Sequence, residues 1–292
     1  MTNQELEDLR RQKWRLNGNP VRSLEDAREF IESVGFALMY PLKPAVLLPT
    51  FVGAWAGSDE KLPTWQHAFA DPRARDATEL MVRLLRERDA YEANLLGENS
   101  TFLVAASIFP YFYALVGEPN FKQAPKAGPR SEYSELACDA FAAIQRKGPI
   151  SKLQLQQELG GGVSTAALDK SLNDLWARLR ITRVDYKESE GASWDVLYRW
   201  APDAVREGVE LSQASALTAL LSKYLDTVGA ADQQQLDAFF GNFVSRSRVQ
   251  EAVRALMGVR ELSFAPGEKG PLIQLTVVPE RVDRVGPFRP KR

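Results

Sequence analysis

An internal repeat with a constant offset of 81 residues constrains the fold most. The segment from Gly148 to Ile181 aligns without a gap on the segment from Gly229 to Leu262. Matched pairs are Gln154 with Gln235, Leu155 with Leu236, Leu159 with Phe240, Gly160 with Gly241, Val163 with Val244, Ser164 with Ser245, Leu168 with Val249, Leu172 with Val253 and Leu175 with Leu256. Self-similarity at a fixed period indicates one structural unit used twice.

Each copy contains the signals of three helices and a hairpin. In the first copy we expect a helix over 131–146, a short helix in "SKLQLQQEL", and a third helix that Ser164 caps. Two β-prone runs, "RITRVDYK" and "WDVLYRW", then flank the turn-like "ESEGAS". The second copy has a helix over 212–226 and the hairpin signal "VRELSFA" followed by "PLIQLTVV". This order is typical of a winged helix.

The glycines of "LGGGVST" raise the alternative of a phosphate-binding loop. Such a loop needs a buried strand before it and a lysine directly before the Ser or Thr, where this chain has Val163. The preceding segment is polar and begins at Ser151 after Pro149, which suits a capped helix. The glycines are therefore expected to join two helices.

The N-terminal third follows a different sequence pattern. We expect helices over 3–16, from Leu24 after the cap Ser23 to about Val34, and over 72–88. The apolar segment 35–57 is interrupted by Pro41, Pro44 and Pro49 and is expected to run through a core as extended pieces. An aromatic cluster from Phe102 to Tyr113 could stack bases, but it lacks interleaved Lys or Arg and favours a core.

The predicted fold class is mainly α with small β-hairpins (α+β), built from tandem winged helix-turn-helix modules. The expected organisation is an N-terminal helical or winged-helix-like domain over 1–121, a linker over 122–130, a winged helix over 131–202, a second over 211–278, and a flexible basic tail over 279–292.

Charge and composition exclude some classes of function. The formal net charge of −1 gives no global basic field, although a local basic face stays open. The lone cysteine, Cys138, lies in an apolar helical run and is expected to be buried. The chain has one histidine, His67, which is too few ligands for a closed zinc site and excludes most histidine-based catalytic triads. We expect no metal and no cofactor. A charged N-terminus and the absence of a long apolar run predict a cytoplasmic protein without membrane contact.

Three phrases carry a family resemblance: "VGFALMYPLKP", "STFLVAASIFPYFYALVG" and "LNDLWARLRITRV". They resemble the bacterial helix-turn-helix proteins related to the AlkZ and YcaQ DNA glycosylases. The resemblance implies a DNA-facing protein of tandem winged helices, whose glycosylase members excise alkylated or crosslinked bases with an early Gln-x-Gln or Gln-x-Asp motif after a helix.

The chain departs from this motif. After Val34 it reads "GFALMYP", without glutamine or carboxylate, so the catalytic residues are unknown. The literal Gln-x-Gln strings, at 154–156 and 233–235, fall on the second helices of the repeats, where a structural role is expected.

Double-stranded DNA is the expected partner, and the second repeat is its expected reader. In a winged helix the third helix enters the major groove, and "SRSRVQEAVR" supplies cations and hydroxyls at its start. The predicted DNA-binding residues are Ser245, Arg246, Ser247, Arg248, Gln250, Arg254 and, in the wing, Lys269. The first repeat carries Asp169 and Asp174 at the matching helix and is expected to be scaffold or subunit contact, with a homodimer left open.

Three functions therefore compete. The leading prediction is a non-catalytic DNA-binding protein in transcriptional control or DNA maintenance. The alternatives are a DNA glycosylase with a displaced active site and a protein-interaction scaffold that binds no nucleic acid.

Overall fold

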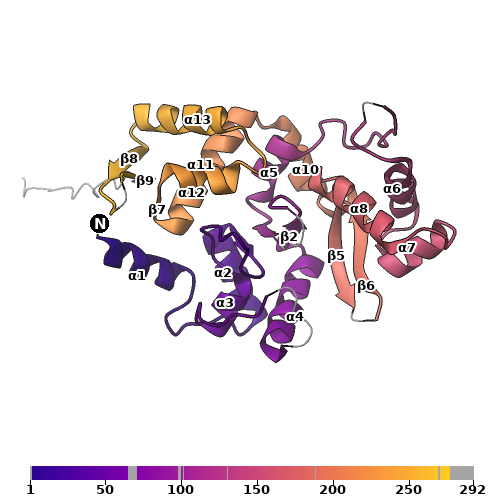
Figure 1. The fold of residues 1–292 in the computed structure, drawn as a ribbon, viewed down its shortest axis with the longest axis horizontal. Helices are drawn as coiled ribbons and strands as arrows, with labels where there is room; N and C mark the ends of the chain where they lie inside the picture. The colour runs from indigo at the N-terminus through magenta and orange to yellow at the C-terminus, as the bar shows by residue number, and fades with distance from the viewer. Residues whose placement is uncertain are drawn as a thin grey trace, which may run out of the picture.

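The computed structural model describes residues 2–64, 71–97, 100, 102–129, 131–187, 189–268 and 270–276. Its C-terminal two thirds contain the predicted repeat (Figure 1). The first repeat unit consists of α6 (Glu135–Lys147), β4 (Ile150–Ser151), α7 (Lys152–Glu158), α8 (Thr165–Ala177), β5 (Ile181–Lys187) and β6 (Gly191–Val196). The second consists of α11 (Gln213–Val228), β7 (Ala230–Ala231), α12 (Gln233–Phe240), α13 (Arg246–Gly258), β8 (Leu262–Ala265) and β9 (Leu272–Leu275).

The offset of the sequence repeat is conserved in the structure. Helix α8 begins and ends 81 residues before α13, and β5 and β6 begin 81 residues before β8 and β9. Ser164 caps α8, and its hydroxyl accepts from the Ala167 amide at 3.2 Å. The predicted helices and hairpins of both repeats are thus confirmed within the described residues.

The N-terminal unit has the same order of elements. It consists of α2 (Leu24–Val34), β1 (Phe36–Leu38), α3 (Phe51–Ala56), α4 (Pro72–Glu87), β2 (Ala90–Ala93) and β3 (Phe102–Ala105), and α1 (Asn3–Lys13) precedes it. In all three units the third strand lies between the first and the second and pairs antiparallel with both. The segments between units hold α5 (Phe109–Val116), α9 (Leu197–Trp200) and α10 (Pro202–Glu210).

Among the described residues, three apolar cores fix how the units pack, and the first lies within the N-terminal unit, between α2, α3, α4 and its sheet. The second joins the N-terminal unit to the second repeat unit, where the ring of Phe36 on β1 stacks on Phe239 of α12 with centroids 5.3 Å apart, and Phe239 stacks on Tyr224 of α11 at 5.0 Å. The aromatic cluster Phe102, Phe109, Phe112 and Tyr113 belongs to this core, as predicted. The first repeat unit has a separate core between α6, α7, α8 and its sheet.

Three expectations were wrong. Residues 51–56 form helix α3 rather than an extended piece, because Thr50 follows Pro49 and accepts a hydrogen bond from the Gly53 amide, which caps a new helix. Strand β6 ends at Val196, because Leu197 turns into the core as the start of α9. Cys138 is partly exposed rather than buried.

Helix α1 is attached to the second repeat unit by its side chains. Arg10 donates from Nε to the Val228 carbonyl at 2.8 Å and from Nη2 to the Ala230 carbonyl at 2.7 Å. Lys13 donates to the Asp226 carbonyl at 2.8 Å, and the Trp14 indole to the Thr227 carbonyl at 2.9 Å. The carbonyls of Asp226, Thr227 and Val228 lie at the C-terminal end of α11, where they have no partner within the helix, and that of Ala230 lies in β7.

Among the described helices, none is both long and apolar enough to cross a membrane.

Candidate nucleic-acid interface

The predicted DNA-binding residues lie at the N-terminal half of α13. Val249, Ala252, Val253 and Leu256 bury one side of this helix. With 100° between successive residues, the opposite side presents Ser247, Gln250 and Arg254, together with Glu251. Arg246 and Arg248 lie at the two edges of this outward face, about 200° apart. Lys269 lies outside the described residues.

The start of α13 differs from the start of α8 in its capping. The Ser164 hydroxyl caps α8, whereas the Ser245 hydroxyl makes no capping bond in the described structure and lies 3.2 Å from the Ser247 hydroxyl. The Arg248 amide donates to the Ser245 carbonyl at 3.0 Å, and the amides of Arg246 and Ser247 have no bond to the Ser245 side chain. Unsatisfied amides at a helix N-terminus favour an anion such as phosphate.

Two acidic groups lie near this basic start, Glu251 on the outward face of α13 and Asp237 of α12. Asp237 of α12 forms an ion pair with Arg246 at 2.9 Å, and the Arg246 side chain stays 69% exposed. Asp237 also accepts from the Gln233 amide at 2.8 Å. An exposed pair of this kind contributes little to stability, so Arg246 can exchange its partner for a phosphate at small cost.

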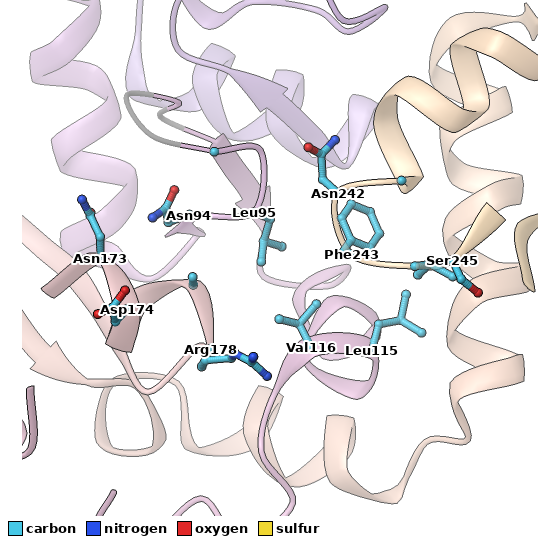
Figure 2. Close-up of a pocket in the computed structure, with 14 residues that line it drawn as sticks. Asn94, Leu95, Leu115, Val116, Asn173, Asp174, Arg178, Asn242, Phe243 and Ser245 are labelled. Atoms are coloured by element: carbon cyan, nitrogen blue, oxygen red, sulfur yellow. The ribbon is translucent and has the colours of Figure 1, made fainter. Parts of the chain in front are cut away.

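A hollow of about 740 Å³ begins beside Ser245. Figure 2 shows Asn242, Phe243 and Ser245 from the α12–α13 turn on one side. On the other side it shows Asn173 and Asp174 of α8 and Arg178, which follows this helix. Leu95, Leu115 and Val116 lie between the two sides. All three units therefore border this hollow.

Two further hollows extend it along α8. A second, of about 640 Å³, shares Asn94, Asn173 and Asp174 with the first. A third, of about 340 Å³, shares Asp169, Arg183 and Trp194 with the second. We call the three together the α8 groove. It leads from the start of α13 to the β5–β6 hairpin.

Arg183 of β5 lies where the second and third hollows meet. Its Nη1 donates to Glu92 of β2 at 3.0 Å, and its guanidinium carbon lies 4.3 Å from the ring centroid of Trp176 and 5.1 Å from that of Trp194. The Glu92 side chain is 2% exposed and the Arg183 side chain 33%. A buried carboxylate and two indoles thus hold a partly exposed guanidinium in one orientation.

The sequence predicted the start of α13 but missed the groove. Arg183, Asn94 and Asn173 come from three segments far apart in the chain. Of the predicted residues that the structure describes, only Ser245 lines the groove. Arg183 lies within "RITRVDYK", but the sequence analysis interpreted this segment only as a strand and did not assign its arginine to a site. The first repeat, expected to be scaffold, supplies one wall.

The Gln-x-Gln strings have the structural role that the sequence predicted. Gln154 and Gln235 complete capping boxes with Ser151 and Asp232, and the Gln156 amide donates to the Val163 carbonyl at 2.7 Å. At the expected place of the catalytic motif, β1 carries the buried apolar residues Phe36, Ala37 and Leu38.

No cluster of three metal-ligating side chains occurs in the part of the chain that the structure describes. No curated protein matches the chain. A family model does match, under the description "DNA glycosylase AlkZ-like", and it covers residues 58–291. This match includes α4, both repeat units and every wall of the α8 groove except the residues before position 58. The chain therefore belongs to the AlkZ-like DNA glycosylase family.

Proposed function

We propose that the protein binds double-stranded DNA through α13, that its three units act as winged helices, and that it does not excise bases. The observation that carries the proposal is the outward face of α13, where Ser247, Gln250 and Arg254 lie between two flanking arginines above an uncapped helix start. The family relationship supports DNA as the partner.

The proposal gives different roles to these residues. Arg246 and Arg248, at the two edges, are placed for the phosphates on either side of a groove, whereas Gln250 and Arg254 on the outward face are placed for base edges. The burial of the opposite side of α13 favours a flanking position for both arginines.

The test is duplex binding by fluorescence anisotropy over a range of salt concentrations. Arg248→Ala should lower the salt slope by about one unit on any sequence, and Arg254→Ala should cost about 1–3 kcal/mol on a preferred site. Arg206→Ala is the control, because Arg206 is an exposed arginine on α10, outside α13, and it should change neither quantity. If an Arg246→Ala/Arg248→Ala double variant keeps the wild-type affinity and salt slope, α13 is not part of the DNA interface.

The second candidate function is base excision, which the family relationship favours. The buried apolar strand β1 supports the non-catalytic proposal, because Phe36, Ala37 and Leu38 offer no group that could activate water. A duplex carrying alkylated purines should yield no abasic sites with this protein. Multiple turnovers by substoichiometric protein would overturn the non-catalytic proposal.

The third candidate, a scaffold without nucleic acid, is distinguished by the same binding assay. Phosphate contacts are strongest at low salt, so duplex binding should be measurable at about 50 mM salt. Undetectable binding there would favour the scaffold.

A further inference from the structure

The second strand of each unit lies at an edge of its sheet. These strands are β2 in the N-terminal unit, β5 in the first repeat unit and β8 in the second, and in each sheet the third strand occupies the centre. In all three units the carbonyl directly before the second strand accepts from the amide directly after the third. The pairs are Asp89 with Ala106 at 3.0 Å, Arg180 with Leu197 at 3.0 Å and Glu261 with Thr276 at 2.9 Å. The three strands therefore begin at equivalent positions and can be compared residue by residue.

The edges of β2 and β5 cover each other. The two strands are in contact, and the Glu92 carbonyl of β2 accepts from the Thr182 hydroxyl of β5 at 2.9 Å. Glu92 and Arg183 stand at the third position of their strands and form the ion pair described above. The chain thus joins two of its units through their second strands, with opposite charges at one equivalent position.

Strand β8 has no such partner in the part of the chain that the structure describes. It pairs with β9 on one side, packs on α13, and has no described strand on its other side. Its third position holds Phe264, which is 63% exposed. Figure 1 shows the β8–β9 hairpin at one end of the molecule, away from the first repeat unit. An edge strand without a charged residue or a bulge is a template for another strand.

The backbone of β8 offers four hydrogen-bonding groups at this open edge. Antiparallel strands bond through every second residue. Glu261 bonds towards the β9 side, so Ser263 and Ala265 do the same, and Leu262 and Phe264 direct their N–H and C=O groups to the open edge. Two donors and two acceptors are thus available to a further strand.

The side chain at the third position indicates which strand fits this edge. In a symmetric dimer each copy presents the same residue to the other, so a charged residue at the contact would face its own charge. Glu92 and Arg183 can therefore bind each other but not their own copies. Phe264 is uncharged and can pack on a second Phe264. The edge of β8 suits a second copy of this chain.

We propose that two copies of the chain associate through antiparallel pairing of their β8 strands about a two-fold axis at Ser263. In this register Leu262 exchanges two hydrogen bonds with the partner's Phe264, so all four edge groups are used, and the two Phe264 rings lie diagonally across the pair. A register centred on Phe264 would place Pro266, which has no N–H, opposite Leu262. The contact does not depend on the DNA-binding function proposed above.

The variant Ser263→Cys tests the register, in a Cys138→Ser background that removes the only native thiol. Opposed residues of a non-hydrogen-bonded antiparallel pair have Cα atoms about 4.5 Å apart, which is within disulfide range. Lys187→Cys in the same background is the control, because Lys187 is an exposed residue on β5. Under mild oxidation Ser263→Cys should form a linked dimer about tenfold faster or more, because the contact raises the effective concentration of the two thiols.

Sedimentation of the intact chain over a range of concentrations measures the same contact without a new thiol. Phe264→Glu should lower the association constant by about tenfold or more, because it brings two carboxylates together at the contact. Phe264→Leu should still associate. Val209→Glu is the control, because Val209 is an exposed apolar residue on α10, outside the second repeat unit, and this variant should associate as the wild type does. Circular dichroism shows that each variant is folded.

The proposal is wrong if Ser263→Cys crosslinks no faster than Lys187→Cys, or if Phe264→Glu sediments as the wild type does. If Phe264→Glu leaves sedimentation unchanged but weakens duplex binding, DNA occupies the edge of β8 and the dimer is excluded. Loss of the dimer with wild-type duplex binding confirms the contact and leaves the DNA-binding proposal to its own test.

Discussion

At the scale of single residues, the ion pair between Glu92 and Arg183 joins two units of the fold and also places a cation in the α8 groove. The carboxylate is almost fully buried, and its partner comes from another unit 91 positions along the chain. Glu92 also contributes its backbone, because its carbonyl accepts from the Thr182 hydroxyl at 2.9 Å and from the Trp176 indole at 3.1 Å. This one residue therefore holds β2 of the N-terminal unit against α8 and β5.

Replacing Arg183 by Met should destabilise the protein by about 3 kcal/mol, because Glu92 would stay buried without a cation. The double variant Glu92→Gln/Arg183→Met should lose less than the sum of the two single variants, since it removes both charges together. Urea denaturation of the four proteins measures this coupling. Additive losses would show that the two side chains do not depend on each other.

At the scale of secondary-structure elements, side chains of α1 and of the residue after it bind the C-terminal end of α11 by hydrogen bonds. Helix α1 is outside the element order shared by the three units, yet the donors Arg10, Lys13 and Trp14 all reach carbonyls of residues 226–230. Thr227 of α11 in turn donates to the Val34 carbonyl at the end of α2 at 2.6 Å. The second repeat unit is thus bound to the N-terminal unit by hydrogen bonds as well as by the shared core.

Arg10→Ala should lower the free energy of unfolding by about 1.5–3 kcal/mol, because Arg10 is a charged donor to two carbonyls. Arg11→Ala on the same helix should cost less than about 1 kcal/mol, because its ion pair with Asp59 is exposed. Chemical denaturation compares the two variants. Equal losses would mean that the contacts with α11 add nothing beyond the general packing of α1.

At the scale of the whole molecule, the cores divide the chain differently from its sequence order. The N-terminal unit and the second repeat unit share one core although the first repeat unit separates them in sequence. The first repeat unit keeps its own core and meets the others through β2, β5 and the Glu92–Arg183 contact. The α8 groove runs along this boundary.

Hydrogen exchange should therefore show two cooperative groups. Amides of β1, β3, α11 and α12 should exchange together at the highest protection, whereas those of α6 and α8 should open as a separate group at lower free energy. Mass spectrometry of peptic fragments, taken after exchange of the intact chain, resolves the two groups. Exchange of α11 and α12 independently of β1 and β3 would contradict the shared core.

The sequence determined the elements of this protein. The 81-residue repeat predicted the matching helices and hairpins of both repeat units, because apolar spacing and caps such as Ser164 act over one or two turns of chain. It also predicted the structural role of the Gln-x-Gln strings and the basic start of α13. Helix α3 was missed because three prolines dominated the pattern around one short capped segment.

Only the tertiary structure decided how these elements face one another. Phe36 pairs with Phe239, and Glu92 pairs with Arg183, so the paired residues lie about 90 to 200 positions apart in the chain. The spacing of residues within one helix or strand carries no information about such distant contacts. The α8 groove exists because three units contribute its walls, and none of the three sequences contains it alone. The physical reason is that periodicity fixes which side of an element is buried, whereas packing selects the partner that buries it.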